Sequence, residues 1–367
     1  TCTVAGPPNT ANEGAKPRAV ELLVENAGAT PLGDWPVTGG VPVPRGVLTD
    51  PDEVSVTSGE GLALPCQTRT LSVWPDGSIR WLLVDTQVDV PAHGTVRLRV
   101  GLGERGEVPA VPEPVAIRVD GARAQISTGA AQLCLDADAL VVPGALGLPG
   151  QAPLLGGPGP GGIVVVDAAG RRYSTESARA QITVEETGPL RAVLRADVPH
   201  FDSRGEKLFS SVVRIHAFAG KPWVRVLHTF VNDNVSDTFT TIRELHLATP
   251  RAAGTAGAPS RALQHHDNAY AVTGEDGSVI SSGRHHGGTL EVAAPDGCAL
   301  IAVRHFSENY PKSLSVGPEG VTVGICPDVR HVSYDRDGYE ADRLYYYLTP
   351  EGYRFKCGVS RTHELFY

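Results

Sequence analysis

The chain has 367 residues, a net charge of -9, and 42 glycines and 29 prolines that follow no repeating period. A chain of this length buries a sizeable core and is most simply divided into two domains. The high glycine and proline content favours many strands joined by tight turns over a helical fold. The negative charge, without a basic stripe, argues against a nucleic-acid partner, and no apolar run is long enough to span a membrane.

Methionine is absent from the sequence, and the six cysteines are widely spaced with no CxxC pair. The absence of methionine, even at position 1, predicts a mature chain whose signal peptide has been removed, and therefore a secreted, extracellular protein. The cysteines are Cys2, Cys66, Cys134, Cys298, Cys326 and Cys357. An even number in an oxidising compartment predicts up to three disulfides. Six buried thiols in a cytosolic protein are the alternative.

The first third of the chain predicts an arm, a β domain and a linker. Residues 1–16 are small and polar and predict a loose N-terminal arm. Residues 17–103 alternate apolar and polar side chains, which is typical of half-buried strands. Residues 104–115 are rich in proline and glutamate without a period, and we interpret them as an interdomain linker.

The clearest hairpin signal of this first domain is the triplet Pro75-Asp76-Gly77. These residues favour a tight turn, and the segments before and after them alternate as strands do. The alternation predicts that Leu71 and Val73 on one side of the turn, and Ile79, Trp81 and Leu83 on the other, are half-buried.

The remaining residues, 116–367, continue as strands, and helical periodicity is missing almost everywhere. Residues 144–162 hold so many glycines and prolines that we expect a long loop there. Two long alternating segments, 209–219 and 223–232, flank a turn at Gly220-Lys221-Pro222. Long paired antiparallel strands of this kind build a large sandwich. The fold prediction is all-β.

A stretch of unusual chemical variety follows an apolar run at 298–303. It contains Arg304, His305, Glu308, Tyr310 and Lys312. A core strand does not tolerate these groups unpaired, and a surface loop does not need such variety. We interpret the stretch as a site for an anionic or sugar-like ligand at a strand end. An exposed junction between a strand and a loop is the alternative.

Two further groups of side chains lie near the C-terminus. In a strand, Arg361 and His363 share one face, and Thr362 and Glu364 share the other, so the first two form a candidate cationic pair. A charged terminal edge strand is the alternative. Six tyrosines lie between residues 334 and 353, and Tyr334 is the first of them. Tyrosine suits both sugar stacking and sheet packing.

Histidines are the only metal-ligand candidates that the sequence offers. They are His265 and His266 with the adjacent Asp267, and His285 with His286. Two histidines and an aspartate would make a plausible set of ligands for a divalent metal. Exposed histidines in polar, glycine-flanked loops are the alternative, and the identity of any metal stays open.

Three motifs, in this order, resemble the exo-rhamnogalacturonan lyase (YetA-like) family. They are Trp-Pro-Asp-Gly-Ser-Ile-Arg-Trp at 74–81, Asn-Tyr-Pro-Lys-Ser at 309–313, and Arg-Thr-His-Glu at 361–364. The resemblance implies an N-terminal RIFT-type β-barrel over 17–103, then a large antiparallel β-sandwich over 116–367. The family continues into an α/α-toroid domain, which we expect to be absent from this chain. Arg361 stands where the family's motif has a lysine, which keeps the charge but alters the donor geometry.

The resemblance implies β-elimination on a uronate-containing polysaccharide. In this hypothesis Arg304, Lys312 and Arg361 neutralise the uronate, His305 or His363 is the base, and Tyr310 is the acid. Glu308 and Tyr334 are candidate substrate-binding residues beside Arg304, and Ca²⁺ is the candidate cofactor. The alternative is a non-catalytic extracellular protein, either a glycan-binding module or a structural subunit of a surface assembly. Its partner would then be a glycan, a second copy or another chain.

Overall fold

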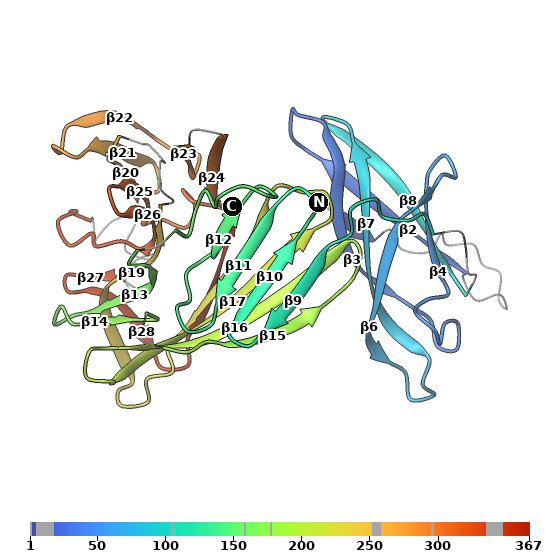
Figure 1. Cartoon of the computed structure of the whole chain (residues 1–367), viewed down its shortest axis with the longest axis horizontal. Coiled ribbons are helices and arrows are strands. Elements are labelled where there is room, and N and C mark those ends of the chain that lie inside the picture. Colours follow the sequence, from blue (N-terminus) through green and yellow to red (C-terminus); the bar gives the residue numbers. More distant parts are fainter. Residues whose placement is uncertain are drawn as a thin grey trace. The chain divides into compact units, whose positions relative to one another are not determined.

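The computed structural model describes residues 2–4 (as backbone), 18–103, 106, 108–157, 159–176, 178–251, 258–294, 297–334 and 348–367. These residues form strands, turns and irregular segments, with no helix among them (Figure 1). The all-β prediction is therefore confirmed. No membrane-spanning helix occurs in the described part of the chain.

The chain divides into two compact units. Unit 1 comprises Thr1–Val115 with Gly188–Arg191, and unit 2 comprises Ala116–Thr187 with Ala192–Tyr367. The strands of unit 1 are β1 (Cys2–Val4), β2 (Ala19–Asn26), β3 (Leu32–Pro42), β4 (Val54–Ser58), β5 (Ala63–Leu64), β6 (Cys66–Val73), β7 (Ile79–Val90) and β8 (Gly94–Leu102).

Unit 1 is built from two sheets with the strand orders β1-β2-β8-β4-β5 and β3-β7-β6. Alternate residues of both sheets enter one apolar core, among them Leu22, Leu98 and Val100 from the first sheet and Leu82 and Val84 from the second. The predicted N-terminal arm is not wholly loose, because Cys2–Val4 pairs with β2. The rest of that arm lies outside the described residues.

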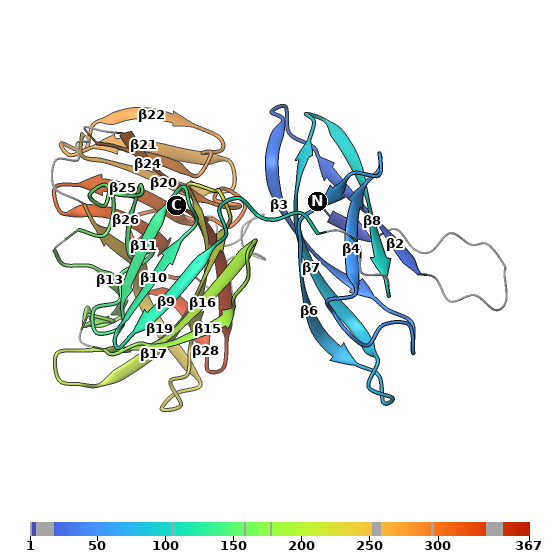
Figure 2. The same ribbon diagram turned by 45° about the vertical axis from the view of Figure 1, so that its right-hand side comes forward.

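The hairpin predicted at Pro75-Asp76-Gly77 joins β6 to β7, which lie side by side in Figure 2. The Asp76 carboxylate accepts the backbone N–H of Ser78 at 3.0 Å, and Gly77 adopts the positive φ of 84° that this turn requires. The expected burial pattern is wrong for Leu71 and Val73, which are exposed.

On β7, the expected alternation fails at Trp81 because the pairing with β6 is irregular. Ser72 opposes Trp81 and Val73 opposes Ile79, so Arg80 is the extra residue of a bulge. Beyond the bulge, the buried apolar side chains of β7 are the even-numbered residues and no longer the odd-numbered ones. Leu82 is buried, whereas Trp81 is 42% exposed.

Unit 2 begins with a four-stranded antiparallel sheet of order β12-β11-β10-β9, whose strands lie side by side in Figure 1. These strands are β9 (Ala116–Asp120), β10 (Arg123–Ser127), β11 (Gln132–Asp136) and β12 (Ala145–Gly147). The predicted glycine- and proline-rich loop of residues 144–162 is present, apart from β12 and the first residue of β13 at Gly162.

The second sheet of unit 2 has 17 strands, β13 to β29. Its first strands are β13 (Gly162–Asp167), β14 (Arg172–Ser174), β15 (Gln181–Glu186), β16 (Arg191–Phe201), β17 (Lys207–Phe218), β18 (Val224–Val231), β19 (Phe239–Pro250) and β20 (Ser260–His266). The others are β21 (Ala269–Gly274), β22 (Val279–Gly283), β23 (Thr289–Ala294), β24 (Gly297–Val303), β25 (Lys312–Gly317), β26 (Gly320–Cys326), β27 (Leu348–Thr349), β28 (Gly352–Lys356) and β29 (Ser360–Phe366).

The second predicted hairpin is β17–β18, in which Ser210–Ala217 of β17 pairs with the whole of β18. On β17, Val213, Ile215 and Ala217 are buried, while the residues between them are partly exposed, as the alternation indicated. The disulfide prediction is not borne out, because five cysteines are free thiols: Cys66, Cys134, Cys298, Cys326 and Cys357. The side chain of Cys2 lies outside the described residues.

A buried row of polar side chains crosses three strands of this sheet: His200 on β16, Ser211 on β17 and His228 on β18. The Ser211 hydroxyl lies 2.9 Å from Nε2 of His200 and 2.9 Å from Nε2 of His228. One hydroxyl hydrogen serves one imidazole, so the second imidazole must donate its own N–H to the serine oxygen. The two neutral rings therefore hold opposite tautomers. Burial lowers the pKa of His200 to about 3 and that of His228 to about 4.

Because of these two buried histidines, we expect the folded protein to lose stability in acid. The unfolded chain protonates them below about pH 6.5, whereas the folded chain does not until about pH 3 to 4. In that window the unfolded state binds more protons, so the free energy of unfolding falls as the pH falls, by up to about 1.4 kcal/mol per pH unit for each histidine. Urea unfolding at a series of pH values measures the slope.

His228→Gln keeps a hydrogen-bonding group but cannot titrate, so it should flatten this pH dependence. His285 is exposed, and His285→Gln is the matched control that should leave the slope unchanged. Equal slopes in all three proteins would show that the buried row does not set the acid sensitivity.

Candidate functional site

The C-terminal strand β29 brings the two predicted site segments together. It pairs with β18 along its length, where Phe230 opposes Arg361 and His228 opposes His363. Its end pairs with β24, and the backbone N–H of Arg304 donates to the carbonyl of Glu364 at 3.0 Å. The turn after β24 therefore begins beside β29.

That turn, residues 304–311, exposes three of the predicted side chains. Arg304 donates to the Glu364 carboxylate at 3.0 Å, and Glu364 also accepts from Arg225 at 2.6 Å. His305 has a positive φ of 55°, and its Nδ1 lies 3.8 Å from the carboxylate of Glu308. Arg304, His305 and Glu308 are all exposed and contribute nothing to the cavity described next.

The other four predicted side chains of these two segments line one cavity of about 80 Å³. They are Tyr310 and Lys312 from the end of the turn and the start of β25, and Arg361 and His363 from β29. The rest of the wall is Phe230, Asn309, Pro311, Ile325, Cys326, Leu348, Tyr353 and Phe355. Arg361 is exposed at one side, where its guanidinium donates to the Asn309 side chain at 2.6 Å.

Lys312 is a buried ammonium group without an anionic partner among the described residues. Lys312 is only 3% exposed, and its Nζ donates to the carbonyl of Ile325 at 2.7 Å. No carboxylate of the described residues forms an ion pair with it. Burial, with a smaller effect of the Arg361 charge, lowers the pKa of Lys312 to about 8. The nearby Cys326 acts in the opposite direction.

His363 is a neutral ring in the same cavity. It is 6% exposed and stacks on Phe230 with ring centroids 6.3 Å apart. Its Nε2 is buried and has no hydrogen-bond partner among the described residues. Burial, followed by the charge of Lys312, holds the pKa of His363 far below its usual range. The ring is therefore a hydrogen-bonding group for a ligand and a weak base.

Two further polar groups of the cavity were not among the predicted residues. Burial raises the pKa of the Cys326 thiol to about 11, so this thiol stays protonated at neutral pH. The buried Tyr353 hydroxyl donates to the carbonyl of Pro327 at 2.7 Å. Both come from strands, β26 and β28, whose place beside β25 and β29 follows from sheet pairing. Tyr353 is the last of the six clustered tyrosines noted in the sequence, whereas nothing in the sequence marked Cys326 as a site residue.

Tyr334 and the histidine pairs lie elsewhere. Tyr334 packs against His266 with ring centroids 5.0 Å apart and lines no part of the cavity of Lys312. Tyr339, Tyr345, Tyr346 and Tyr347 of the predicted tyrosine cluster lie outside the described residues.

The structure does not support the metal hypothesis for the histidine pairs. His286 packs between Tyr270 and Phe306, and its Nδ1 accepts the backbone N–H of Gly288. His285 is exposed, and His265 contacts its neighbour His266. Within the described ranges, no three histidine, cysteine, aspartate or glutamate side chains gather as metal ligands would.

Comparisons with known proteins agree with this architecture. Residues 22–100 match the PcRGLX-like N-terminal RIFT barrel domain, and residues 166–249 match the PcRGLX-like protein central beta sandwich domain. Two segments of the chain thus match, in order, the N-terminal and central domain models of rhamnogalacturonan lyase-like proteins, as the resemblance predicted. No curated protein matches the chain.

Two solved structures from Enterococcus faecalis share the fold. One is a protein in the glycosyl hydrolase family 38, with a TM-score of 0.55, and the other is an alpha-mannosidase from strain V583, with a TM-score of 0.52. Each is 12% identical and is matched over 95% of this chain. This chain spans only 44% and 43% of their respective lengths.

Because the ammonium group of Lys312 is buried, we expect the folded protein to become more stable when it is removed. The folded pKa of Lys312, about 8, lies below the ordinary 10.5, so the unfolded chain holds the proton more tightly. The free-energy cost of burying the charged group is therefore present in full below pH 8. Lys312→Met fills similar space without a charge. It should raise the free energy of unfolding at pH 7 by about 1–3 kcal/mol, measured in urea.

The control is Lys356→Met, at an exposed lysine of β28, which should change stability by less than about 0.5 kcal/mol. The wild type should also gain stability between about pH 8 and 10.5, and Lys312→Met should remove that gain. A destabilised Lys312→Met variant would contradict the assignment of Lys312 as an unpaired buried cation.

Proposed function

We propose that the protein acts on a uronate-containing polysaccharide by β-elimination, and that the cavity of Lys312 binds the uronate carboxylate. The single observation that carries the proposal is the buried Lys312 ammonium, which lacks an anionic partner in the described protein. A buried cation is costly unless it is paired. A carboxylate from the ligand would supply the pair, with Arg361 as the second cation at the cavity wall.

The size of the cavity favours a carboxylate over a whole sugar ring. A volume of about 80 Å³ lies well below the range usual for sites that enclose a complete small ligand. C5 of a uronate is bonded directly to the carboxylate carbon. A carboxylate anchored in the cavity therefore holds C5 at its mouth, beside Arg361 and Asn309.

The β-elimination then needs a base and an acid. The base removes the C5 proton, a double bond forms between C4 and C5, the C4–O bond breaks, and the leaving oxygen takes a proton. Charged Lys312 pairs with the carboxylate and cannot also take the proton. The neutral His363, whose Nε2 has no hydrogen-bond partner among the described residues, is the candidate base, although a weak one, and Tyr310 is the candidate acid.

Glycan binding without chemistry is the second candidate. It is favoured by the small cavity and by the low exposure of His363, which limit the approach of C5 to its Nε2. An extracellular location, self-association and a role in a surface assembly remain predictions from the sequence. The free cysteines give the extracellular location no support.

Absorbance of the unsaturated product distinguishes the two candidates. With rhamnogalacturonan, the chain should produce this absorbance, and Lys312→Met or Arg361→Ala should lower the rate by at least about 100-fold. Arg354→Ala, at an exposed arginine of β28 outside the cavity, is the matched control and should retain the rate. The rate at low substrate concentration should fall as the pH rises above about 8, because Lys312 then loses the charge that pairs with the carboxylate.

A binding measurement with digalacturonate completes the test. Binding that depends on Lys312 and Arg361, without absorbance, would assign the glycan-binding function. If neither binding nor absorbance is detected, with or without added Ca²⁺, the proposal fails.

A further inference from the structure

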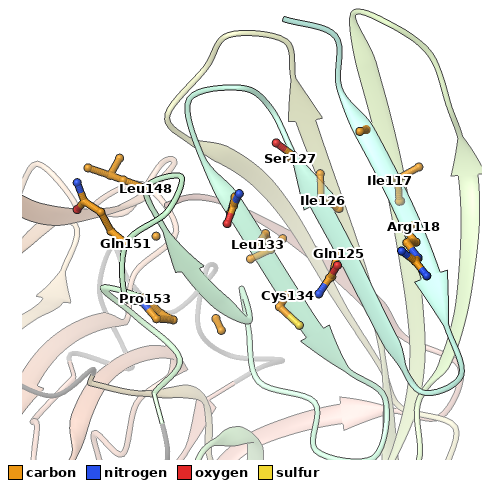
Figure 3. A pocket seen from close by; sticks show the side chains of 14 residues that line it. Ile117, Arg118, Gln125, Ile126, Ser127, Leu133, Cys134, Leu148, Gln151 and Pro153 are labelled. Carbon is orange, nitrogen blue, oxygen red and sulfur yellow. The ribbon is translucent and has the colours of Figure 1, made fainter.

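A second, larger cavity lies in unit 2, on the four-stranded sheet β12-β11-β10-β9, with a volume of about 340 Å³ (Figure 3). Its residues come from all four strands and from the loop after β12. Figure 3 shows Leu148, Gln151 and Pro153 of that loop at one side, Gln125 and Cys134 on neighbouring strands, and Arg118 on β9. It shares no residue with the cavity of Lys312.

Cross-strand register explains why the sheet has a hollow here. Arg118, Gln125, Cys134 and Ala145 oppose one another across the four strands. The next row on the same face is Ala116, Ser127, Gln132 and Gly147. Both rows end in a small residue on β12, and the second also begins with one. The surface of the sheet is therefore hollowed where these small residues stand in place of longer side chains.

The loop after β12 supplies the wall of the hollow. A Cβ on Gly147 would lie 2.9 Å from the Cα of Pro153, closer than real Cβ contacts. Glycine at this position thus allows the loop to pass directly over the strand. Leu148 and Pro153 give this wall an apolar surface.

The glutamines of the cavity are open to solvent, and the Ser127 hydroxyl accepts the backbone N–H of Gly129 at 3.4 Å. The carboxamides of Gln125, Gln132 and Gln151 have no hydrogen-bond partner among the described residues, and no aspartate or glutamate lines the cavity. Its one charged residue, Arg118, already lies 3.8 Å from Asp120. A carboxamide offers both donors and an acceptor, as a sugar hydroxyl does.

We propose that this cavity binds a neutral saccharide unit. The three carboxamides and the Ser127 hydroxyl would bond its hydroxyl groups, and the apolar wall would contact its C–H face. The volume lies in the ordinary range for a small-ligand site. A charged sugar is disfavoured, because Arg118 is paired and no second cation lines the cavity. The inference is independent of the proposed function at Lys312.

Cys134 provides a reporter for the test, since it is a free thiol that lines the cavity. Iodoacetamide labelling of the full chain, followed by mass spectrometry of the peptides, gives the labelling rate of each cysteine separately. The probes are rhamnose, galactobiose and cellobiose as neutral sugars, and digalacturonate as the charged one. Cys298, an exposed thiol outside the cavity, is the internal control.

At least one neutral sugar should slow the labelling of Cys134 and not that of Cys298. Gln125→Ala and Gln132→Ala should each weaken this protection about fivefold, the loss of one hydrogen bond. Gln181→Ala, at an exposed glutamine of β15, is the matched control and should leave protection unchanged. Lys312→Met should also leave it unchanged, which separates this site from the uronate cavity.

Three results would overturn the proposal. They are protection by none of the neutral sugars, protection by digalacturonate alone, and protection that Gln125→Ala and Gln132→Ala reduce no more than Gln181→Ala does. Native-like circular dichroism of each variant shows that a lost effect is not a loss of folding.

Discussion

The candidate site depends on the double pairing of the C-terminal strand. β29 is hydrogen-bonded to β18 along one edge and to the end of β24 along the other. This fixes which face each side chain occupies, so Arg361 and His363 enter the cavity while Glu364 points away from it. Glu364 then holds Arg225 and Arg304 on its own side of the strand. The same carboxylate that secures the strand thereby keeps Arg304 out of the site.

The two buried polar features of this sheet are stabilised differently. His200, Ser211 and His228 stay neutral and share hydrogen bonds at Nε2, so no charge is buried there at neutral pH, although the Nδ1 atoms of both rings have no hydrogen-bond partner among the described residues. Lys312 keeps a charge at neutral pH with only carbonyl acceptors among the described residues, and its burial opposes folding. A fold that retains such a group accepts lower stability at that position, which is common where function requires it. This contrast is the physical reason to place the site at Lys312.

Sequence patterns predicted the fold better than the site. Turn residues and alternation were sufficient for the hairpins at Gly77 and Gly220, because both signals are local. The bulge at Arg80 left no such signal, and it reversed the burial of Trp81 and Leu82.

In the site, the predicted stretch at 304–312 splits into an exposed turn and a buried end. The positive φ of His305 and the ion pair of Arg304 direct the first half outward. Cys326 and Tyr353 enter from strands whose pairing joins distant parts of the chain. The charges of the two cavities differ because sheet pairing gathers different side chains in each. Lys312 of β25 and Arg361 of β29 meet in the first cavity, with no carboxylate among its described lining residues. Cross-strand rows bring the carboxamides of Gln125 and Gln132 together beside small residues in the second. Under the two proposals, the cavity of Lys312 takes a charged unit of a polysaccharide and the cavity on the four-stranded sheet takes a neutral one.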